Sequence, residues 1–162
     1  MNSQVYTGQY SAAFDKPHVV TLIGFRINKL WAIHHWLPFL IRFFTVKKYS
    51  ISKYKASVLL SKTWFAWREI MLVQYWRSLD SLEEFAQSNT EPHIKSWRDY
   101  NKIAKHASFG IWHETYYIEP NCHEVVYNNM PRTGLAMAQK HHKLSDGFNF
   151  SQIKIKNKRT LE

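Results

Sequence analysis

Residues 18–28 read HVVTLIGFRIN, and this stretch decides the fold. Val, Ile, Thr and Phe dominate it, and these residue types favour a β-strand. Successive side chains of a strand point to opposite sides, so Val19, Thr21 and Phe25 share one face while Leu22 and Arg26 share the other. Both faces are largely apolar, and the second ends in polar groups. The stretch therefore predicts a strand that is buried on both sides and has one polar end.

A helical pattern follows this strand directly. Apolar residues recur at steps of three and four across residues 29–46, which is typical of a helix with one buried face. Asn28 is suited to cap its first turn. Pro38 lies inside the pattern and should kink or split the helix, because proline removes a backbone donor.

The later part of the chain alternates between extended and helical patterns. We expect strands at residues 53–62, 69–77 and 110–119, an aromatic connection at 64–67, helices at 78–88 and 90–106, a short extended segment at 123–129 and a turn at 130–134. Ser78 or Asp80 is the expected cap of the first of these helices. The resulting βαββαβ order favours an antiparallel, ferredoxin-like sheet.

Helices cover only one face of such a sheet. The other face also needs a cover, because strands this apolar on both sides cannot leave one side in water. Pairing of two such sheets in a homodimer supplies that cover. The sequence thus predicts an α+β, dimeric α/β-barrel domain over residues 18–138, an N-terminal arm over residues 1–17 and a basic C-terminal tail over residues 139–162.

Length and composition fit a single intracellular domain. The chain has 162 residues, of which 45% are hydrophobic and 16% aromatic. Its one cysteine, Cys122, has no partner for an internal disulfide, which favours a reducing compartment, and we expect the cytoplasm. No basic run leads into an apolar stretch at the amino terminus, so no signal peptide is expected. The apolar segment 30–46 is too short and too polar to predict a membrane span.

The formal net charge of +10 raises the question of an anionic partner. Basic residues cluster at 47–55 and at 154–159, in an expected loop and an expected tail. Neither cluster carries a recognisable nucleic-acid-binding motif. A solvated surface is therefore the favoured interpretation, and we expect no nucleic-acid partner.

Three stretches carry a resemblance to a known family. They read LIGFRIN at 22–28 with WLP at 36–38 behind it, VQYWRS at 73–78, and GIWHETY at 110–116 continued by YNNMP at 127–131. Together they resemble the fumagillin-pathway monooxygenase-like proteins, within the antibiotic-biosynthesis-monooxygenase-like superfamily. The resemblance implies a dimeric α/β barrel that oxidises a hydrophobic, polyketide- or polyene-like molecule in its interior. Members of this superfamily either need no cofactor or bind haem.

Three residues are candidates for catalysis. His113, between aromatic residues on a strand, can act as a general base or ligate a haem iron, although a histidine in a sheet also often serves packing. Arg77 can stabilise a developing oxyanion, or else pair with Asp80 or Glu114. Trp76 can contribute an indole N–H to the same charge or pack in the core.

A second group of residues is expected to bind the substrate. They combine flat aromatic walls with polar groups that fix orientation, as ligand sites generally do, and core packing explains most of the aromatic ones equally well. The candidates are Arg26, Asn28, Gln74, Tyr75, Trp112, Glu114, Tyr116 and Asn129. Strand alternation prevents His113 and Glu114 from facing the same cavity unless the strand is bulged.

Several other activities have no support in the sequence. GxGxxG, GxxxxGK[ST], GxSxG and HExxH motifs are missing, and the histidines lack the spacing of a zinc site, so we expect no metal. The leading hypothesis is a monooxygenase without a cofactor. The alternatives are a haem-dependent enzyme of the same superfamily, with His113 or another histidine as ligand, and a non-catalytic protein that binds hydrophobic small molecules.

Overall fold

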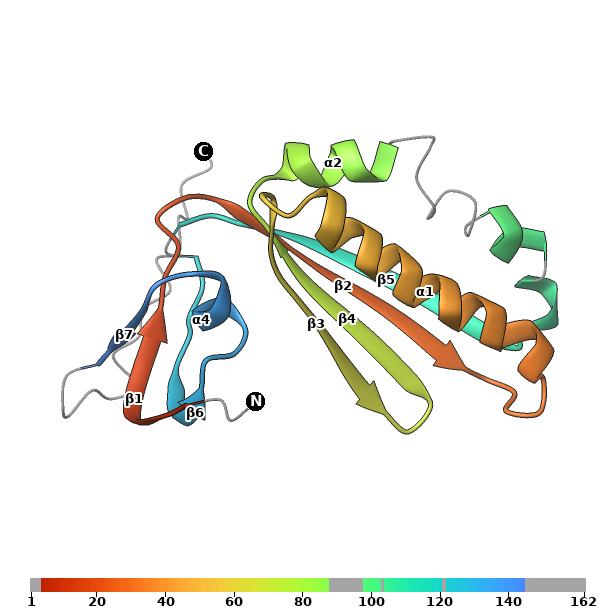
Figure 1. Ribbon diagram of the computed structural model, residues 1–162, viewed down its shortest axis with the longest axis horizontal. Coiled ribbons are helices and arrows are strands. Elements are labelled where there is room, and N and C mark those ends of the chain that lie inside the picture. Colours follow the sequence, from red (N-terminus) through yellow and green to blue (C-terminus); the bar gives the residue numbers. More distant parts are fainter. Residues whose placement is uncertain (1–3, 88–97, 103, 121, 145–162) are drawn as a thin grey trace, which may run out of the picture. The chain divides into compact units, whose positions relative to one another are not determined.

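The computed structural model describes residues 4–87, 98–102, 104–120 and 122–144. Contacts divide the chain into two compact units (Figure 1). One unit consists of Val19–Tyr116. The other combines Met1–His18 with Tyr117–Glu162.

The unit of residues 19–116 is built on a four-stranded sheet with the order β3-β4-β2-β5. Its strands are β2 (His18–Ile27), β3 (Val58–Ala66), β4 (Glu69–Trp76) and β5 (Phe109–Ile118). Strand β4 is antiparallel to both β2 and β3. Helix α1 (Ile33–Lys53) connects β2 to β3, and α2 (Leu79–Gln87) follows β4. This order confirms the predicted α+β, ferredoxin-like class.

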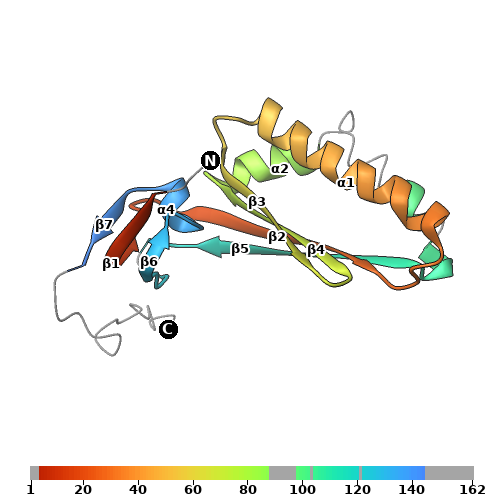
Figure 2. The same cartoon turned by 60° about the horizontal axis from the view of Figure 1, so that its bottom comes forward.

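Both helices lie on the same side of this sheet (Figure 2). Strand alternation turns Phe25, Leu72, Gln74 and Trp76 toward them, and all four side chains are buried. Two buried clusters result on this side. One joins Val19, Tyr54, Trp76 and Phe85, and the other joins Phe25, Phe39 and Phe109. We call this side the covered face and the opposite side the open face.

Helix α1 differs from its prediction at both ends. It was expected at residues 29–46, but it begins at Ile33, continues through Pro38 and ends at Lys53. The backbone N–H groups of Asn28 and Lys29 both donate to the Ser108 carbonyl at 3.0 Å, so Asn28 belongs to a loop and does not cap the helix. The helix extends beyond residue 46 because its later turns still bury one side against the sheet.

Strand β3 starts later than predicted. Residues 54–57 form a turn in which the Ser57 N–H donates to the Tyr54 carbonyl at 2.8 Å, and the strand covers Val58–Ala66 in place of residues 53–62. The aromatic residues expected in the connection are part of the strand, since Phe65 pairs with Ile70. Only two residues, Trp67 and Arg68, remain to join β3 to β4.

The segment after β4 follows the sequence prediction where it is described. The Ser81 N–H donates to Ser78 Oγ at 3.3 Å, which confirms Ser78 as the cap of α2. The predicted helix start at residues 90–92 lies outside the described residues. Residues 98–102 are helical, and Ala104–His106 form a 3₁₀ turn before β5.

The second unit contains a three-stranded sheet with the order β6-β1-β7. Its strands are β1 (Val5–Ala12), β6 (Tyr127–Pro131) and β7 (His141–Lys143), and α4 (Leu135–Ala138) lies between the last two. The expected arm over residues 1–17 therefore contains a strand, and the expected turn at 130–134 begins within another. Most of the expected basic tail lies outside the described residues.

The strand in the expected arm was hidden by an irregular register. Its pairing with β6 shifts between Tyr6 and Gln9, where Gly8 has a φ of 94°. Such a bulge breaks the alternation of side chains on which sequence prediction relies. Among the described helices, none is long and apolar enough to cross a membrane.

Candidate active site

A cavity of about 490 Å³ lies between the covered face of the sheet and the two helices. Its wall is mostly apolar, and it includes one face of α1, one face of α2 and the inward side chains of β2, β4 and β5. The lining residues are Thr21, Ile23, Phe25, Phe39, Arg42, Phe43, Val46, Leu72, Gln74, Leu79, Leu82, Glu83, Phe85, Ala86, Ile111, His113 and Thr115. A cavity of this size and composition suits a hydrophobic small molecule.

Two polar side chains form part of the cavity wall on neighbouring strands. Thr21 and Gln74 are cross-strand partners, and each is 2% exposed. The Gln74 amide donates to Ser50 Oγ at 2.9 Å and to Ser61 Oγ at 3.2 Å, which fixes its orientation. No described residue forms a hydrogen bond with the Thr21 hydroxyl. A buried hydroxyl without a protein partner is suited to bind a polar group of a ligand.

His113 brings an imidazole to the same cavity from the edge strand β5. The side chain is exposed, and its Nε2 lies 3.4 Å from Thr115 Oγ1. This contact is long and leaves the ring available to a ligand. The sequence prediction that His113 faces away from Glu114 is confirmed, because the lining includes His113 and not its neighbour.

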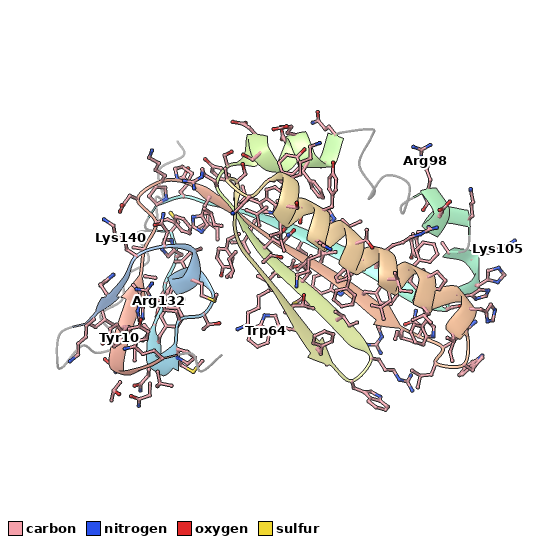
Figure 3. The ribbon with its side chains drawn as sticks, in the orientation of Figure 1. Tyr10, Trp64, Arg98, Lys105, Arg132 and Lys140 are labelled. Carbon is pink, nitrogen blue, oxygen red and sulfur yellow. The ribbon has the colours of Figure 1, made fainter. Side chains whose placement is uncertain are left out.

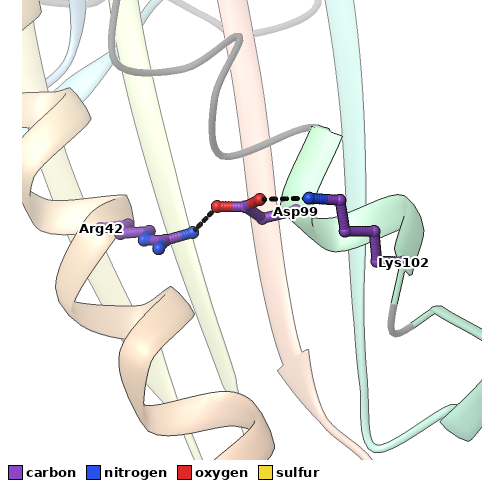
Figure 4. A network of polar contacts seen from close by, with 3 residues as sticks. All are labelled: Arg42, Asp99 and Lys102. Carbon is purple, nitrogen blue, oxygen red and sulfur yellow. Dashed lines mark hydrogen bonds and ion pairs between the residues drawn. The ribbon is translucent and has the colours of Figure 1, made fainter.

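Arg42 is the guanidinium that lines the cavity, and an acidic residue holds it (Figure 4). Its Nη1 lies 2.6 Å from Asp99 Oδ2, and Lys102 Nζ lies 3.4 Å from the other oxygen of the same carboxylate. The hydrogen bond from Arg42 is the main reason that the pKa of Asp99 is lowered. The network joins α1 to the helical segment 98–102.

A second polar group lies on the open face of the sheet. The Trp112 indole N–H donates to Glu69 Oε1 at 2.9 Å, and Arg26 Nη1 lies 3.7 Å from Glu69 Oε2. The indole lies directly over Gly24, where an added Cβ would come within 2.0 Å of Trp112 Nε1. The expected substrate-binding residues Arg26 and Trp112 are thus brought together, on the face opposite the cavity.

The remaining aromatic and acidic candidates also lie on the open face. Tyr75 is half-buried, and burial raises the pKa of its hydroxyl. The Tyr116 hydroxyl donates to Glu114 Oε2 at 2.5 Å, and this hydrogen bond raises the pKa of Tyr116. None of these side chains lines the cavity.

Trp76, Arg77 and Asn28 lie away from the cavity lining. Trp76 is fully buried, and no described residue forms a hydrogen bond with its indole N–H. Arg77 is exposed and donates from Nε to the Ala56 carbonyl at 3.0 Å; among the described residues it pairs with neither acidic residue expected for it. Asn28 is exposed in the loop after β2.

Asn129 belongs to the other unit and has a structural contact there. Its Oδ1 accepts a hydrogen bond from the Gly8 N–H at 2.8 Å, beside the register shift of β1. Both residues have positive φ, 52° for Asn129 and 94° for Gly8. The side chain therefore stabilises an irregular pairing of β1 with β6.

Sequence reasoning missed the helical half of the cavity. Phe39, Arg42, Phe43 and Val46 follow the spacing of one helix face, and this spacing was visible within the predicted helix. The missed residues from α2, such as Glu83, offered no comparable motif. A cavity between a sheet and helices forms only when segments far apart in the chain come together, and a local pattern cannot report that.

Comparison with known proteins places the chain in a family. A dimeric ferredoxin-like protein from an uncultured marine organism is 9% identical, with 64% of this chain and 96% of that chain covered and a TM-score of 0.37. A protein from Shewanella oneidensis is 11% identical, with 72% and 99% covered and a TM-score of 0.34. No curated protein matches significantly. The family described as "Monooxygenase af470-like" matches residues 18–135, and the chain belongs to this family.

Proposed function

We propose that this protein is a monooxygenase-like enzyme that oxidises a hydrophobic, polyketide- or polyene-like molecule in the cavity of the covered face. The observation that carries the proposal is the composition of that cavity. Its wall is apolar apart from a few polar groups, among them the buried Thr21 and Gln74 and the exposed His113. An apolar chamber with few, separated polar groups binds a hydrophobic molecule in one orientation.

The proposed reaction needs a base, a means of stabilising negative charge and molecular oxygen. His113 takes a proton from an activated CH₂ group of the substrate, and the resulting carbanion reacts with oxygen. In the net reaction the CH₂ group and O₂ give a carbonyl group and water, so the substrate supplies all the electrons. Thr21 and Gln74 orient the substrate from the cavity wall.

Arg42 takes the role that the sequence suggested for Arg77. It lines the cavity, whereas Arg77 is bound to a loop carbonyl. A guanidinium near the substrate stabilises an enolate or carbanion by charge. The Asp99 carboxylate fixes the position of that guanidinium.

The haem-dependent alternative also relies on His113. It is the histidine among the cavity-lining residues, and an axial imidazole is a frequent ligand of haem iron. Haem would supply oxygen activation when bound. An absorption spectrum of the purified protein separates the two possibilities, because a Soret band in proportion to protein supports haem and its absence from active protein supports the proposal.

We also propose that the open face is covered by a second copy of the chain. Leu22, Met71 and Val73 are half-buried on this face, beside Trp112. Two such sheets packed face to face bury these apolar side chains. Val73→Glu places a charge at this surface and should convert a dimer to a monomer in analytical ultracentrifugation, while exposed Lys140→Glu in the other unit should leave the mass unchanged.

The test of the proposed function starts from a molecule that the protein retains. Mass spectrometry of denatured, purified protein identifies a copurified hydrophobic ligand, and oxygen uptake is then measured with that ligand and with polyketide-like and polyene-like compounds. Ala86→Trp fills the cavity from α2, since Ala86 lines it and is exposed. We expect this variant to lose both ligand and oxygen uptake.

The matched control is Ala56→Trp, which adds the same side chain to an exposed loop away from the cavity lining. It should retain ligand and activity. Ligand retention without oxygen uptake or product in the wild-type protein would favour the non-catalytic binder. Equal ligand retention by the two tryptophan variants would contradict the cavity as the binding site.

A further inference from the structure

The excess positive charge of this protein is confined to one part of the chain. Residues 16–68 contain ten of the 22 Lys and Arg residues and no Asp or Glu. The remaining twelve basic residues are balanced by all twelve acidic ones. The whole formal charge of +10 therefore arises from the segment that forms β2, α1, β3 and their connections.

Two of the most exposed aromatic side chains lie at one end of the sheet formed by this segment. Trp31 is 78% exposed in the β2–α1 loop, and Trp67 is 86% exposed in the β3–β4 turn. The Ile27 N–H donates to the Arg68 carbonyl at 2.8 Å, which holds the turn beside the end of β2. The loop and the turn thus share this end of the sheet (Figure 1).

The exposed apolar surface continues from this end along α1. Ile33, Leu37 and Ile41 recur at steps of four residues and are all exposed. Phe65 is also exposed, and its ring stacks on Phe44 of the same helix, with the two ring centroids 6.4 Å apart. We define the apolar patch as Leu30, Trp31, Ile33, Leu37, Ile41, Phe65 and Trp67.

Basic side chains border the apolar patch. Arg68 lies in the β3–β4 turn, Arg26 of β2 pairs with Glu69 beside that turn, and Lys29 precedes Leu30. Lys29 Nζ donates to the His106 carbonyl at 2.8 Å, which brings the exposed Lys105 to the same end (Figure 3). The nearby acidic residue, Glu69, already pairs with Arg26 and Trp112.

We propose that the apolar patch and its basic border bind the surface of a lipid bilayer that contains anionic phospholipids. Tryptophan favours the boundary between acyl chains and headgroups, where its ring is buried and its N–H stays hydrated. A helix face with exposed aliphatic residues and neighbouring cations is the usual form of such a contact. The cations attract anionic headgroups, and the excess positive charge of residues 16–68 strengthens this attraction. The contact is peripheral, and it does not depend on the chemistry of the cavity.

The apolar patch is distinct from the proposed homodimer interface. The proposed interface uses Leu22, Val73 and Trp112 on the open face of the sheet, and none of these belongs to the patch. Trp31 and Trp67 lie in connections at the sheet end and so remain available in a dimer of that kind. Binding of another copy or of nucleic acid to the patch is a competing outcome that the same experiment detects.

The first experiment is co-sedimentation of the full chain with phosphatidylcholine vesicles, with and without phosphatidylserine. We expect binding to the anionic vesicles, weakened by salt because the headgroup attraction is screened. The double variant W31S/W67S should partition into the vesicles at least tenfold less. The reason is that it loses the free energy gained when two indole rings bury their apolar area. Met137→Ser removes an exposed apolar side chain in the other unit and should bind like the wild type.

The second experiment compares two charge reversals of equal size. Lys105→Glu lies at the border of the patch, and Lys140→Glu lies in the other unit (Figure 3). Each lysine near an anionic membrane contributes about fivefold in partitioning, so Lys105→Glu should weaken binding at least that much more than Lys140→Glu. Equal effects of the two would attribute binding to net charge alone and would overturn the proposal.

Three further outcomes would also overturn it. One is the absence of vesicle binding at low salt, and another is binding by W31S/W67S that equals the wild type. The third is evidence that the patch binds another occupant while the wild type binds no vesicles. A lower mass of W31S/W67S in ultracentrifugation would indicate another copy of the chain, and loss of RNA binding in W31S/W67S would indicate nucleic acid. Circular dichroism checks the fold of the double variant, and Trp67→Ser alone repeats the test if the double variant is destabilised. Failure here leaves the oxygen-uptake assay unaffected, so the two proposals are tested separately.

Discussion

The two faces of the four-stranded sheet have different environments. The covered face is packed by α1 and α2, and it holds buried polar groups such as Gln74 next to a cavity. The open face carries half-buried aliphatic and aromatic side chains together with the Arg26–Glu69–Trp112 group. Adjacent residues of one strand therefore contribute to unrelated surfaces. A sequence motif such as WHET contains side chains for both faces, so its residues cannot be assigned to one site as a block.

The largest difference in stability is expected between substitutions of two neighbouring residues of β4. Trp76 is fully buried on the covered face, and Trp76→Ala should lower the free energy of unfolding by about 3–5 kcal/mol, because it opens a large cavity in the core. Tyr75→Ala, on the half-buried open face, should cost clearly less. Chemical denaturation of both variants measures the difference. Equal costs would mean that the two faces are buried alike.

A smaller effect is expected from overpacking on the open face. A side chain at Gly24 meets the Trp112 indole, so Gly24→Val should displace the ring and cost about 1–3 kcal/mol. Trp112→Ala removes the obstacle, and the double variant should cost less than the two single variants added together. A double-mutant cycle by thermal or chemical unfolding gives this coupling. Simple additivity would show that the indole does not lie over Gly24.

Removing the buried amide of the covered face should cost somewhat less again. Gln74→Leu leaves the Ser50 hydroxyl without its donor in a buried position, and we expect a loss of about 1–2 kcal/mol. Ser61→Ala removes the longer and less buried of the two contacts and should have a smaller effect. Denaturation curves of these variants provide the comparison. A neutral Gln74→Leu would mean that the amide has no structural role.

The smallest effect concerns Asp99, which pairs with the cavity-lining Arg42. The pKa of Asp99 is below its ordinary value of 3.8, and the largest cause of this lowering is the hydrogen bond from Arg42. A carboxylate with a lowered pKa in the folded state stabilises the fold above its ordinary pKa, and this contribution is lost as the pH falls through the lowered value. Arg42→Met should raise the pKa of Asp99, as measured by NMR titration. Lys102→Met should shift it less, and an unchanged pKa in Arg42→Met would contradict the ion pair.

The fold was largely predictable because its signals are local. The run HVVTLIGFRIN, the cap at Ser78 and the alternation of β5 each report on their own segment, and together they predict the βαββαβ order. Failures occurred where tertiary contacts dominate. Helix α1 extends to Lys53 through burial against the sheet, and β1 is hidden by the bulge at Gly8.

The candidate site was predictable only in part. Gln74 and His113 line the cavity, and their roles there stay predictions. Arg26, Tyr75, Trp112, Glu114 and Tyr116 lie on the open face. Alternation divides these residues into two groups, but it does not tell which group faces the helices. That choice depends on the packing of α1 and α2, which bring Arg42 and Glu83 to the cavity from distant parts of the chain.

If oxidation takes place on the covered face, substitution of two adjacent residues of β5 should have different effects on activity. Oxygen uptake with the identified substrate is compared for the wild type, His113→Asn and Glu114→Gln. We predict a loss of about 10²–10⁴-fold for His113→Asn, as expected for removal of a general base, and near wild-type uptake for Glu114→Gln. Loss of activity in Glu114→Gln with retention in His113→Asn would place the chemistry on the open face and rule out the cavity as the active site.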